Sequence, residues 1–596
     1  MLRSSLPRRS SLVPALAVTA LAALLPVVGG TAVAVAAPEP DCAEAYPLAD
    51  VAPGLTVDGA TVSQGTEPQP FDGTVLGVVR DGIAPGVDMI VADLDSPAIE
   101  AAGGIWQGMS GSPVYADGRL LGAVSYGLSN GPSSIAGITP FDAMDDYLPE
   151  VERRVALGPA LQQRVVRSAD VSARLAGGGL SELEVPLGVS GVPARLLAQA
   201  ARKADGRPWF SGRAHVMGSA GRAPGGPSAD ALVAGGNLGA SLAYGDVSMA
   251  GVGTVTSVCG DSLVGFGHPL TFAGDDLTLG LHPAEAVYVQ PESLGAPFKV
   301  ANLGDPVGTV TDDHLTGITG TVGASPATIK VVSDITSGER HRVGTSYVTV
   351  PAALGEVAFY QHIGNHQTVV DESGPGTERQ TWTIRGFDRD GTPFRIVHSA
   401  FYASEQDLLF ASAWGLPGLL ERITRLPGVR ITSVRNVSVV DPDAELLKLG
   451  PVKQRVQGGD LVPVDRRRPA VVKPGGTLRL VLSLRGGAEP RTTTVSFDIP
   501  RTARSVEGAF LARGGATSED DFYGGDEVIV VAGRTAAPRT RLDALIASLR
   551  NQPRADQVSV SMYLYGRRTE IERTVTSKSL GAPVKGYKVG SVVLAK

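Results

Sequence analysis

The sequence predicts a mostly β protein made of several domains, and three observations support this prediction. At 596 residues the chain is too long for one hydrophobic core, since single domains usually span about 100–200 residues. Its 75 glycines and 42 prolines follow no collagen period and are typical of short strands joined by tight turns. Hydrophobic residues make up 43% of the chain and aromatic residues 5%, so each domain has enough apolar side chains for a core.

The N-terminal residues have the pattern of an export signal. Three arginines within the first nine residues precede an almost wholly apolar run at 12–28, and small residues follow at 34–36. This order is that of a secretory signal peptide, which we place at residues 1–36. A retained membrane anchor is the alternative, although the apolar run is barely long enough to span a bilayer. Because no later run is as apolar, we expect an exported chain, secreted or held in the cell envelope, without a membrane span after signal removal.

Residues 37–150 are predicted to form a first β region. The runs TVLGVVRDG, MIVADL and IAGITP have the composition of strands, and Asp117-Gly118 between two apolar runs marks a hairpin turn. Residues 151–186, which contain AGGG at 176–179, are expected to be a connector. A second glycine-punctuated β region is predicted over residues 187–380.

The remaining chain divides into a mixed segment and a β domain. Residues 381–460 are predicted to be mixed α/β, with one helix over 405–426 because Ser404 can cap its first turn and Pro-Gly follows its end. Residues 461–596 contain TLRLVLSLRG and TTTVSFDIP, which alternate as a half-buried antiparallel sheet does. We predict a C-terminal β-sandwich-like accessory domain, interrupted by one helix at 542–550.

Charge and cysteine content limit the partners. The formal charge of −7 provides no basic field, so we expect no nucleic-acid partner. Cys42 and Cys259 are the two cysteines of the chain. Outside the cytoplasm they can form one disulfide between the mature N-terminus and the middle of the chain, and two free buried thiols fit the sequence equally well.

A metal site is not expected. His362 and His366 in HIGNH have the i,i+4 spacing that binds zinc on a helix. The glycine and asparagine between them disfavour a helix, however, and the glutamate of an H-E-x-x-H motif is missing. We therefore predict no metal ligands and no cofactor.

The candidate catalytic nucleophile lies in the segment at 103–127, GGIWQGMSGSPVYADGRLLGAVSYG. A nucleophilic serine must project from a turn whose backbone N–H groups face the developing oxyanion, and glycines permit such a turn. In GMSGSP, Ser110 holds the nucleophile position of a chymotrypsin-like G-x-S-G-x-P turn. The N–H groups of Gly108 and Ser110 would then form the oxyanion hole.

This segment resembles the SpoIVB peptidase family of serine peptidases. The resemblance rests on GGI-x-QGMSGSP, on the following hairpin, and on the strand MIVADLD, which ends in an aspartate fifteen positions before the serine. It implies a serine endopeptidase with a chymotrypsin-like fold of two β-barrels, an acyl-enzyme mechanism, and a triad of Asp, Ser and His. Ser110 would be the nucleophile and Asp95 the carboxylate that orients the histidine, with Asp93 on the same strand as its competitor.

The histidine departs from the family order. The family places it before the serine, in G-x-L-G-H after a G-x-G-T-(L/V)-T strand, whereas this chain has no histidine before His215. The segment GVGTVTSVCGDSLVGFGHPL at 251–270 resembles that pattern but follows the serine, and it makes His268 the candidate general base. Geometry rather than chain order defines a triad, so the order Asp95, Ser110, His268 is physically admissible.

The sequence thus favours a secreted serine endopeptidase that acts on protein or peptide substrates. The alternative is a catalytically inactive peptidase-fold scaffold or binding protein of the cell envelope, which the missing upstream histidine favours. The predicted sandwich-like domain suits surface attachment, so association with the cell wall is a further candidate interaction.

Overall fold

The described part of the chain begins at Cys42. The computed structural model describes residues 42–595 except 129–130, 145–153, 156, 170, 184–186, 205–206, 208–209, 211–213, 219–225, 276, 292–296, 444, 487–489, 504–506, 517–540, 551–552 and 566–569. The expected signal peptide, residues 1–36, lies outside these residues. Within them, no helix combines the length and the apolar character needed to cross a membrane.

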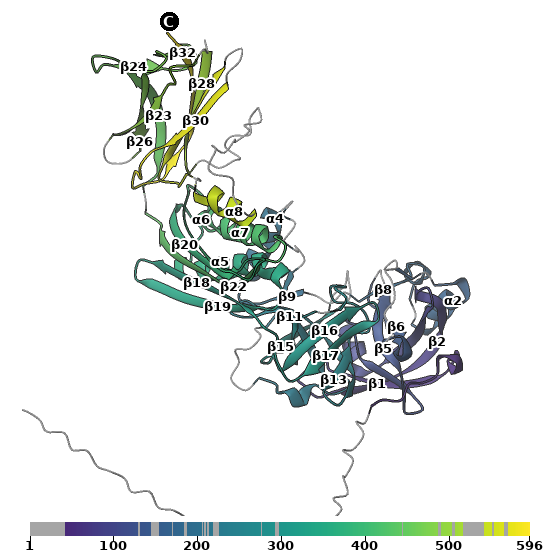
Figure 1. Ribbon diagram of the computed structural model, residues 1–596. Helices are drawn as coiled ribbons and strands as arrows, with labels where there is room; N and C mark the ends of the chain where they lie inside the picture. Colours follow the sequence, from purple (N-terminus) through teal and green to yellow (C-terminus); the bar gives the residue numbers. More distant parts are fainter. Residues whose placement is uncertain are drawn as a thin grey trace, which may run out of the picture. The chain divides into compact units, whose positions relative to one another are not determined.

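The first β region closes into a six-stranded antiparallel barrel (Figure 1). Its strands are β1 (Thr56–Thr61), β2 (Gln69–Ala84), β3 (Val87–Asp95), β4 (Pro113–Ala116), β5 (Arg119–Leu128) and β6 (Ile135–Pro140). Their order is β4-β1-β2-β3-β6-β5, and the pairing of β4 with β5 closes the ring. The expected hairpin turn joins β4 to β5, with Asp117 and Gly118 at φ of 49° and 75°, as a tight two-residue turn requires.

The segment expected as a connector is attached to this first barrel. It contributes two strands and two helices, and β8 pairs with β5 so that the sheet continues beyond the ring. These elements are β7 (Arg154–Val155), β8 (Leu180–Glu182), α2 (Pro159–Ser168) and α3 (Ala173–Ala176). Leu161 and Val165 of α2 belong to the same buried apolar cluster as Met89 of the barrel. The segment therefore packs as part of the first barrel.

The second β region also closes into a six-stranded antiparallel barrel. Its strands are β11 (Asn237–Gly245), β12 (Met249–Cys259), β13 (Ser262–Gly265), β14 (Leu279–Gln290), β16 (Gly308–His314) and β17 (Gly317–Val322). The order is β12-β13-β17-β16-β14-β11, and the pairing of β11 with β12 closes the ring. Three further strands extend it: β9 (Leu187–Val189), β10 (Ala214–Val216) and β15 (Phe298–Leu303). The two barrels confirm the predicted chymotrypsin-like core.

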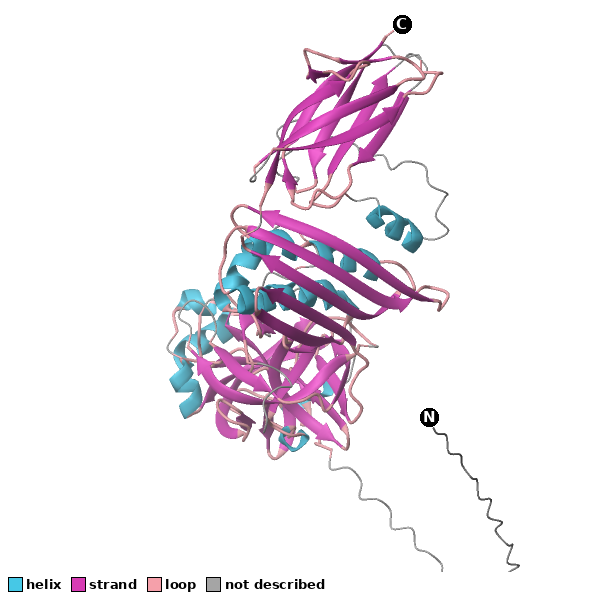
Figure 2. Cartoon of the chain, turned by 90° about the vertical axis from the view of Figure 1, so that its left-hand side faces the viewer, coloured by secondary structure: helices cyan, strands magenta, loops and turns pink. Residues whose placement is uncertain are grey.

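A helix-covered sheet continues from the second barrel through β11. It contains β19 (Arg340–Val348), β18 (Ile329–Ser337), β22 (Arg430–Asp441), β20 (Gly376–Phe387) and β21 (Pro393–Ser404) in that order. The helices that lie on one face of it, drawn cyan in Figure 2, include α5 (Leu354–Val370), α6 (Leu408–Ala413) and α7 (Gly415–Thr424). They bury Phe359, Leu409 and Leu420 in the same apolar core as Ile384 of the sheet.

Two expectations for the helices were wrong. The helix expected over 405–426 is divided into α6 and α7 at Trp414, and Asp407 rather than Ser404 caps α6 through the N–H of Phe410 at 3.3 Å. The segment HIGNH, for which a helix was disfavoured, lies inside α5. Tertiary contacts override the low helix propensity of glycine here, because a Cβ at Gly364 would lie 2.5 Å from the carbonyl oxygen of Gly191.

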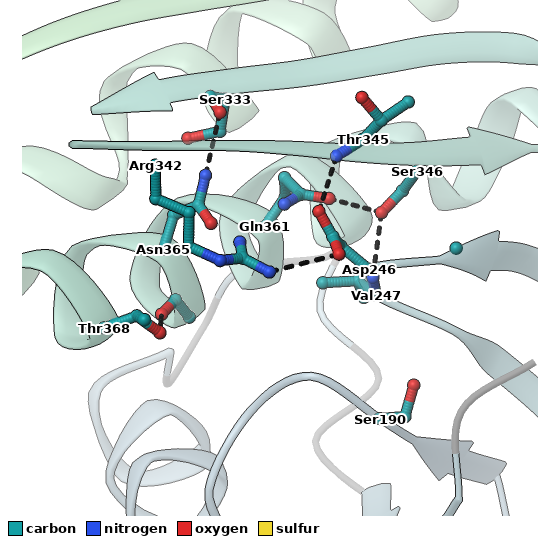
Figure 3. A network of polar contacts seen from close by, with 12 residues as sticks. Ser190, Asp246, Val247, Ser333, Arg342, Thr345, Ser346, Gln361, Asn365 and Thr368 are labelled. Atoms are coloured by element: carbon teal, nitrogen blue, oxygen red, sulfur yellow. Dashed lines mark hydrogen bonds and ion pairs between the residues drawn. The ribbon is translucent and has the colours of Figure 1, made fainter. Parts of the chain in front are cut away.

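A polar network attaches α5 to the sheet and to the second barrel (Figure 3). Asp246, in the turn between β11 and β12, accepts from the N–H of Thr345 at 2.7 Å and from Arg342 Nη2 at 3.1 Å. Ser346 donates to Gln361 of α5 and accepts from the N–H of Val247. These bonds satisfy buried polar groups and fix the position of the helix.

The C-terminal residues form the predicted β-sandwich, with two five-stranded sheets. One sheet holds β23 (Leu447–Arg455), β24 (Leu461–Val464), β26 (Thr477–Arg485), β27 (Arg491–Asp498) and β31 (Val584–Lys585). The other holds β25 (Ala470–Val472), β28 (Glu507–Gly514), β29 (Val558–Tyr565), β30 (Glu570–Thr576) and β32 (Tyr587–Leu594). Alternate residues of both sheets, among them Leu480, Phe497 and Phe510, share one buried core. The remaining elements are α1 (Pro97–Ala102), α4 (Ala194–Lys203), α8 (Arg541–Arg550), η1 (Leu48–Asp50), η2 (Phe141–Ala143), η3 (Ala229–Ala231) and η4 (Pro351–Ala353).

Acid is expected to weaken the second barrel through His282 of β14. This imidazole is fully buried between Ser241 Oγ (2.7 Å) and the carbonyl oxygen of Gly304 (2.9 Å), and burial lowers its pKa from 6.5 to about 4. Between these values the unfolded chain binds a proton that the folded chain does not, so stability falls as pH falls from 6.5 to 4. The free energy of unfolding that is lost on acidification should be smaller in His282→Gln by about 3 kcal/mol, since one pKa unit corresponds to about 1.4 kcal/mol.

Urea unfolding of both proteins at pH 7 and pH 4 measures this difference. Equal losses in the two proteins would contradict the prediction. His341→Gln serves as the control, since His341 is exposed and should leave the loss unchanged.

Candidate active site

The turn that carries Ser110 connects α1 to β4 and is held by a strand of the other barrel. Thr254 of β12 donates its N–H to the carbonyl oxygen of Ser110 (2.8 Å) and its hydroxyl to that of Gly108 (3.1 Å). Thr256 donates its hydroxyl to the carbonyl oxygen of Gly111 at 2.8 Å. The carbonyl groups of the turn are therefore satisfied by the second barrel, which fixes the orientation of the peptide planes.

Glycine is required at both ends of this turn. Gly108 and Gly111 have φ of 91° and 93°, in the left-handed region that favours glycine. A Cβ at Gly111 would lie 2.0 Å from the carbonyl oxygen of Thr254. A Cβ at Gly108 would lie 3.0 Å from Lys299 Cβ and 3.2 Å from the carbonyl oxygen of Val252. The glycines of GMSG thus permit both the backbone conformation and the close approach of β12.

The backbone N–H groups of Gly108 and Ser110 are buried and unpaired within the described part of the chain. This is unusual, because more than about 90% of buried backbone N–H groups have a hydrogen-bond partner. The carbonyl groups of the same two residues are both bonded. The turn therefore holds two free donors of the kind that an oxyanion hole requires.

His268 lies in the loop between β13 and β14 and reaches Ser110. Its Nε2 is 2.8 Å from Ser110 Oγ, and its Nδ1 is 2.8 Å from the carbonyl oxygen of Pro269. Gly267 before it has φ of 70° and offers its carbonyl oxygen to the hydroxyl of Thr139 at 2.7 Å. The structure thus brings together the predicted nucleophile and the predicted base from different barrels. Both side chains are fully buried.

Asp95 is not brought to His268 by any contact within the described residues. It ends β3 opposite Asp72 of β2, its side chain is exposed, and it makes no hydrogen bond or ion pair to a described residue. Its competitor Asp93 accepts a hydrogen bond from Ser168. The orienting role of Asp95 stays a prediction. Asp275, an aspartate seven positions after His268, pairs with His314.

Sequence reasoning missed Asp313, which fixes the loop of the histidine. Asp313 of β16 is fully buried, and its carboxylate accepts from the N–H groups of Leu270 (2.8 Å) and Thr271 (2.7 Å) and from the hydroxyl of Thr271 (2.7 Å). These residues follow the His268-Pro269 pair in the same loop. No motif marks Asp313, because its partners are backbone groups about forty positions away.

Replacing Asp313 is expected to loosen this loop. Asp313→Asn turns one acceptor into a donor that faces the N–H groups, and the free energy of unfolding should fall by about 2 kcal/mol. Asp95→Asn is the matched control, since an exposed carboxylate without a partner should change stability by less than about 0.5 kcal/mol. Urea unfolding at pH 7 compares the two, and similar losses would refute the assignment.

Lys299 lies beside the nucleophile turn and was not singled out in the sequence. Its backbone N–H donates to the carbonyl oxygen of Gln107 at 2.9 Å, so β15 runs along the turn. Its Nζ donates to Asn237 Oδ1 at 2.7 Å, and burial lowers the pKa of this amine to about 7. A lysine at this position thus fills the space next to Gly108 with its aliphatic stem.

The two cysteines are joined. A disulfide links Cys42, at the start of the described residues, to Cys259 at the end of β12. Since Thr254 and Thr256 of the same strand hold the Ser110 turn, this bond attaches the N-terminal segment to the strand that supports the site.

Comparison with known families now assigns this region. Residues 49–143 match the family model of the SpoIVB peptidase S55. These residues are similar to the SpoIVB peptidase S55 family. The match confirms the resemblance found in the sequence, and the matched stretch contains β1 to β6, Asp95 and the Ser110 turn. It ends before His268, so the family match includes the nucleophile but not the base. No curated protein and no solved structure matches the chain.

Proposed function

We propose that this protein is a secreted serine endopeptidase of the SpoIVB type, with Ser110 as nucleophile and His268 as general base. The observation that carries the proposal is the 2.8 Å approach of His268 Nε2 to Ser110 Oγ beside an S55 turn with two free N–H groups. Protein or peptide substrates follow from the family. The N-terminal signal pattern and the Cys42–Cys259 disulfide support export to an oxidising compartment.

The contacts support the following mechanism. With Nδ1–H donated to the carbonyl oxygen of Pro269, His268 keeps a lone pair on Nε2 that accepts the Ser110 proton. Ser110 Oγ then attacks the peptide carbonyl, and the N–H groups of Gly108 and Ser110 stabilise the oxyanion. His268 returns the proton to the leaving amine, and water hydrolyses the acyl-enzyme. In this scheme the carbonyl oxygen of Pro269 orients His268 through Nδ1, and the orienting role that the family resemblance implies for Asp95 stays a prediction.

Labelling with a fluorophosphonate probe tests the proposal. The wild type should form a covalent adduct, whereas Ser110→Ala and a heat-denatured sample should not. Ser561→Ala, a replacement in the C-terminal sandwich, should label like the wild type. Because Ser110 and His268 are fully buried, entry of the probe requires a rearrangement that exposes them. Equal labelling of Ser110→Ala would refute the assignment.

A second function is favoured by the burial of the pair. A peptidase fold that keeps Ser110 closed off from solvent suits a scaffold or binding protein of the cell envelope. Complete absence of labelling in the natively folded wild type, with and without mild heating, would favour this function. Sedimentation of the protein with purified cell walls tests wall association in either case.

A further inference from the structure

The two N–H groups of the Ser110 turn that have no partner among the described residues belong to two peptide units, each of which also contains a carbonyl group. The N–H of Gly108 shares its unit with the carbonyl of Gln107, and the N–H of Ser110 shares its unit with the carbonyl of Met109. Both units are trans, so the N–H and the C=O of each point in opposite directions. The hydrogen bonds that these two carbonyl groups accept therefore set the direction in which the two N–H groups point.

The carbonyl oxygen of Gln107 is bonded from the second barrel. It accepts from the backbone N–H of Lys299 in β15 at 2.9 Å, and the N–H of Gln107 donates to the carbonyl oxygen of Pro297 at 2.7 Å. These two bonds hold Gln107 against the edge of β15, so the N–H of Gly108 points away from that strand. Because the donor to Gln107 is a backbone group, a side-chain replacement does not remove it.

The carbonyl oxygen of Met109 is bonded by Ser112, which is fully buried. It accepts from the N–H of Ser112 at 3.0 Å and from Ser112 Oγ at 2.6 Å. The same Oγ lies 2.9 Å from Thr61 Oγ1 of β1, which is also buried. A hydroxyl has one proton and a carbonyl oxygen can only accept, so Ser112 donates to Met109 and Thr61 donates to Ser112. A chain of hydrogen bonds thus runs from Thr61 to the peptide unit that carries the Ser110 N–H.

We infer that Ser112 is a positioning residue of the oxyanion hole, with Thr61 as the residue that orients its hydroxyl. The inference rests on the proposed function, because it concerns an oxyanion that forms beside Ser110. Without the hydroxyl of Ser112, the Met109 carbonyl would keep only the longer bond from the Ser112 N–H. The second bond holds the peptide unit against rotation, and it also polarises the unit, which makes the Ser110 N–H a stronger donor.

Fluorophosphonate labelling tests the inference when its rate is separated into the binding of the probe, KI, and the chemical step, kinact. Ser112→Ala should lower kinact by about 10-fold and leave KI unchanged. This is less than the about 10²–10³-fold cost of losing an oxyanion donor, because the N–H of Ser112 still bonds Met109. A loss of folded protein would lower the fraction that is finally labelled and not kinact, so the measurement separates positioning from stability.

Thr61 and a second buried serine provide matched variants. Thr61→Val keeps the shape of the side chain and removes the donor to Ser112, so kinact should fall by a smaller factor than in Ser112→Ala. Thr61→Ser keeps the hydroxyl and should restore kinact. Ser248 is as buried as Ser112, and its Oγ also donates to the carbonyl oxygen three positions before it, that of Gly245 at 3.3 Å. Ser248→Ala should label with the kinact of the wild type.

The outcomes separate this inference from the proposed function. A wild-type kinact in Ser112→Ala and Thr61→Val would overturn the inference and leave the proposed function intact, and so would an equal fall in Ser248→Ala. Absence of labelling in the wild type would overturn both, since no oxyanion would then form beside Ser110. If Ser112→Ala does not fold, the comparison of Thr61→Val with Thr61→Ser decides the matter.

Discussion

His268→Ala is expected to reduce the rate of fluorophosphonate labelling by about 10²–10⁴-fold, the usual contribution of a general base. The imidazole accepts the proton of Ser110 as the hydroxyl attacks, and without it a neutral alcohol is a weak nucleophile. The only short contact recorded between Ser110 Oγ and a described side chain is the one to His268 Nε2. The second-order rate constant for labelling is the appropriate measurement, because it needs no knowledge of the natural substrate.

Two control variants accompany this prediction. His268→Gln keeps most of the side-chain volume, so its melting temperature should be closer to that of the wild type than the melting temperature of His268→Ala. Its rate constant for labelling should fall as much as that of His268→Ala. His341→Ala removes an exposed histidine of β19 and should label normally. Wild-type rates in both His268 variants would show that another group activates Ser110.

Gly108→Ala is expected to lower the same rate constant by about 10²–10³-fold, as removal of an oxyanion donor does. An alanine at φ of 91° is strained, and its Cβ would press against Lys299 Cβ at 3.0 Å. Relief of this strain requires the peptide plane to turn, and the N–H group then no longer faces the position of the oxyanion. The rate constant for labelling should therefore fall by more than the loss of folded protein can explain.

Gly118→Ala is the matched control for this change. Gly118 has φ of 75°, and a Cβ there would meet nothing within 4 Å. The replacement should cost about 1–2 kcal/mol of stability, the penalty for a left-handed alanine, and leave labelling of the folded protein unchanged. If both glycine variants label alike, the effect at Gly108 is one of backbone strain and not of the oxyanion hole.

The local features of the site could be predicted from the sequence, whereas the contacts between distant segments could not. The turn around Ser110 and the Asp117-Gly118 hairpin depend on glycine conformations that neighbouring residues reveal. His268 could be predicted as a candidate from its glycine context together with the family resemblance of the segment at 251–270. The bonds of Thr254 and Asp313 are made to backbone groups of residues far away in the chain, and those backbone groups carry no sequence signal. The helix over HIGNH was missed for a related reason, because Gly364 is required by contact with Gly191.

The support that β12 gives to the Ser110 turn has a consequence for biosynthesis. The ribosome completes the first barrel about a hundred residues before Thr254, Thr256 and His268 have been made. Until then the turn lacks both its base and the threonines that hold its carbonyl groups. If the proposed function holds, an emerging chain cannot cleave itself or neighbouring chains. Peptidase activity begins only when the second barrel has folded against the first.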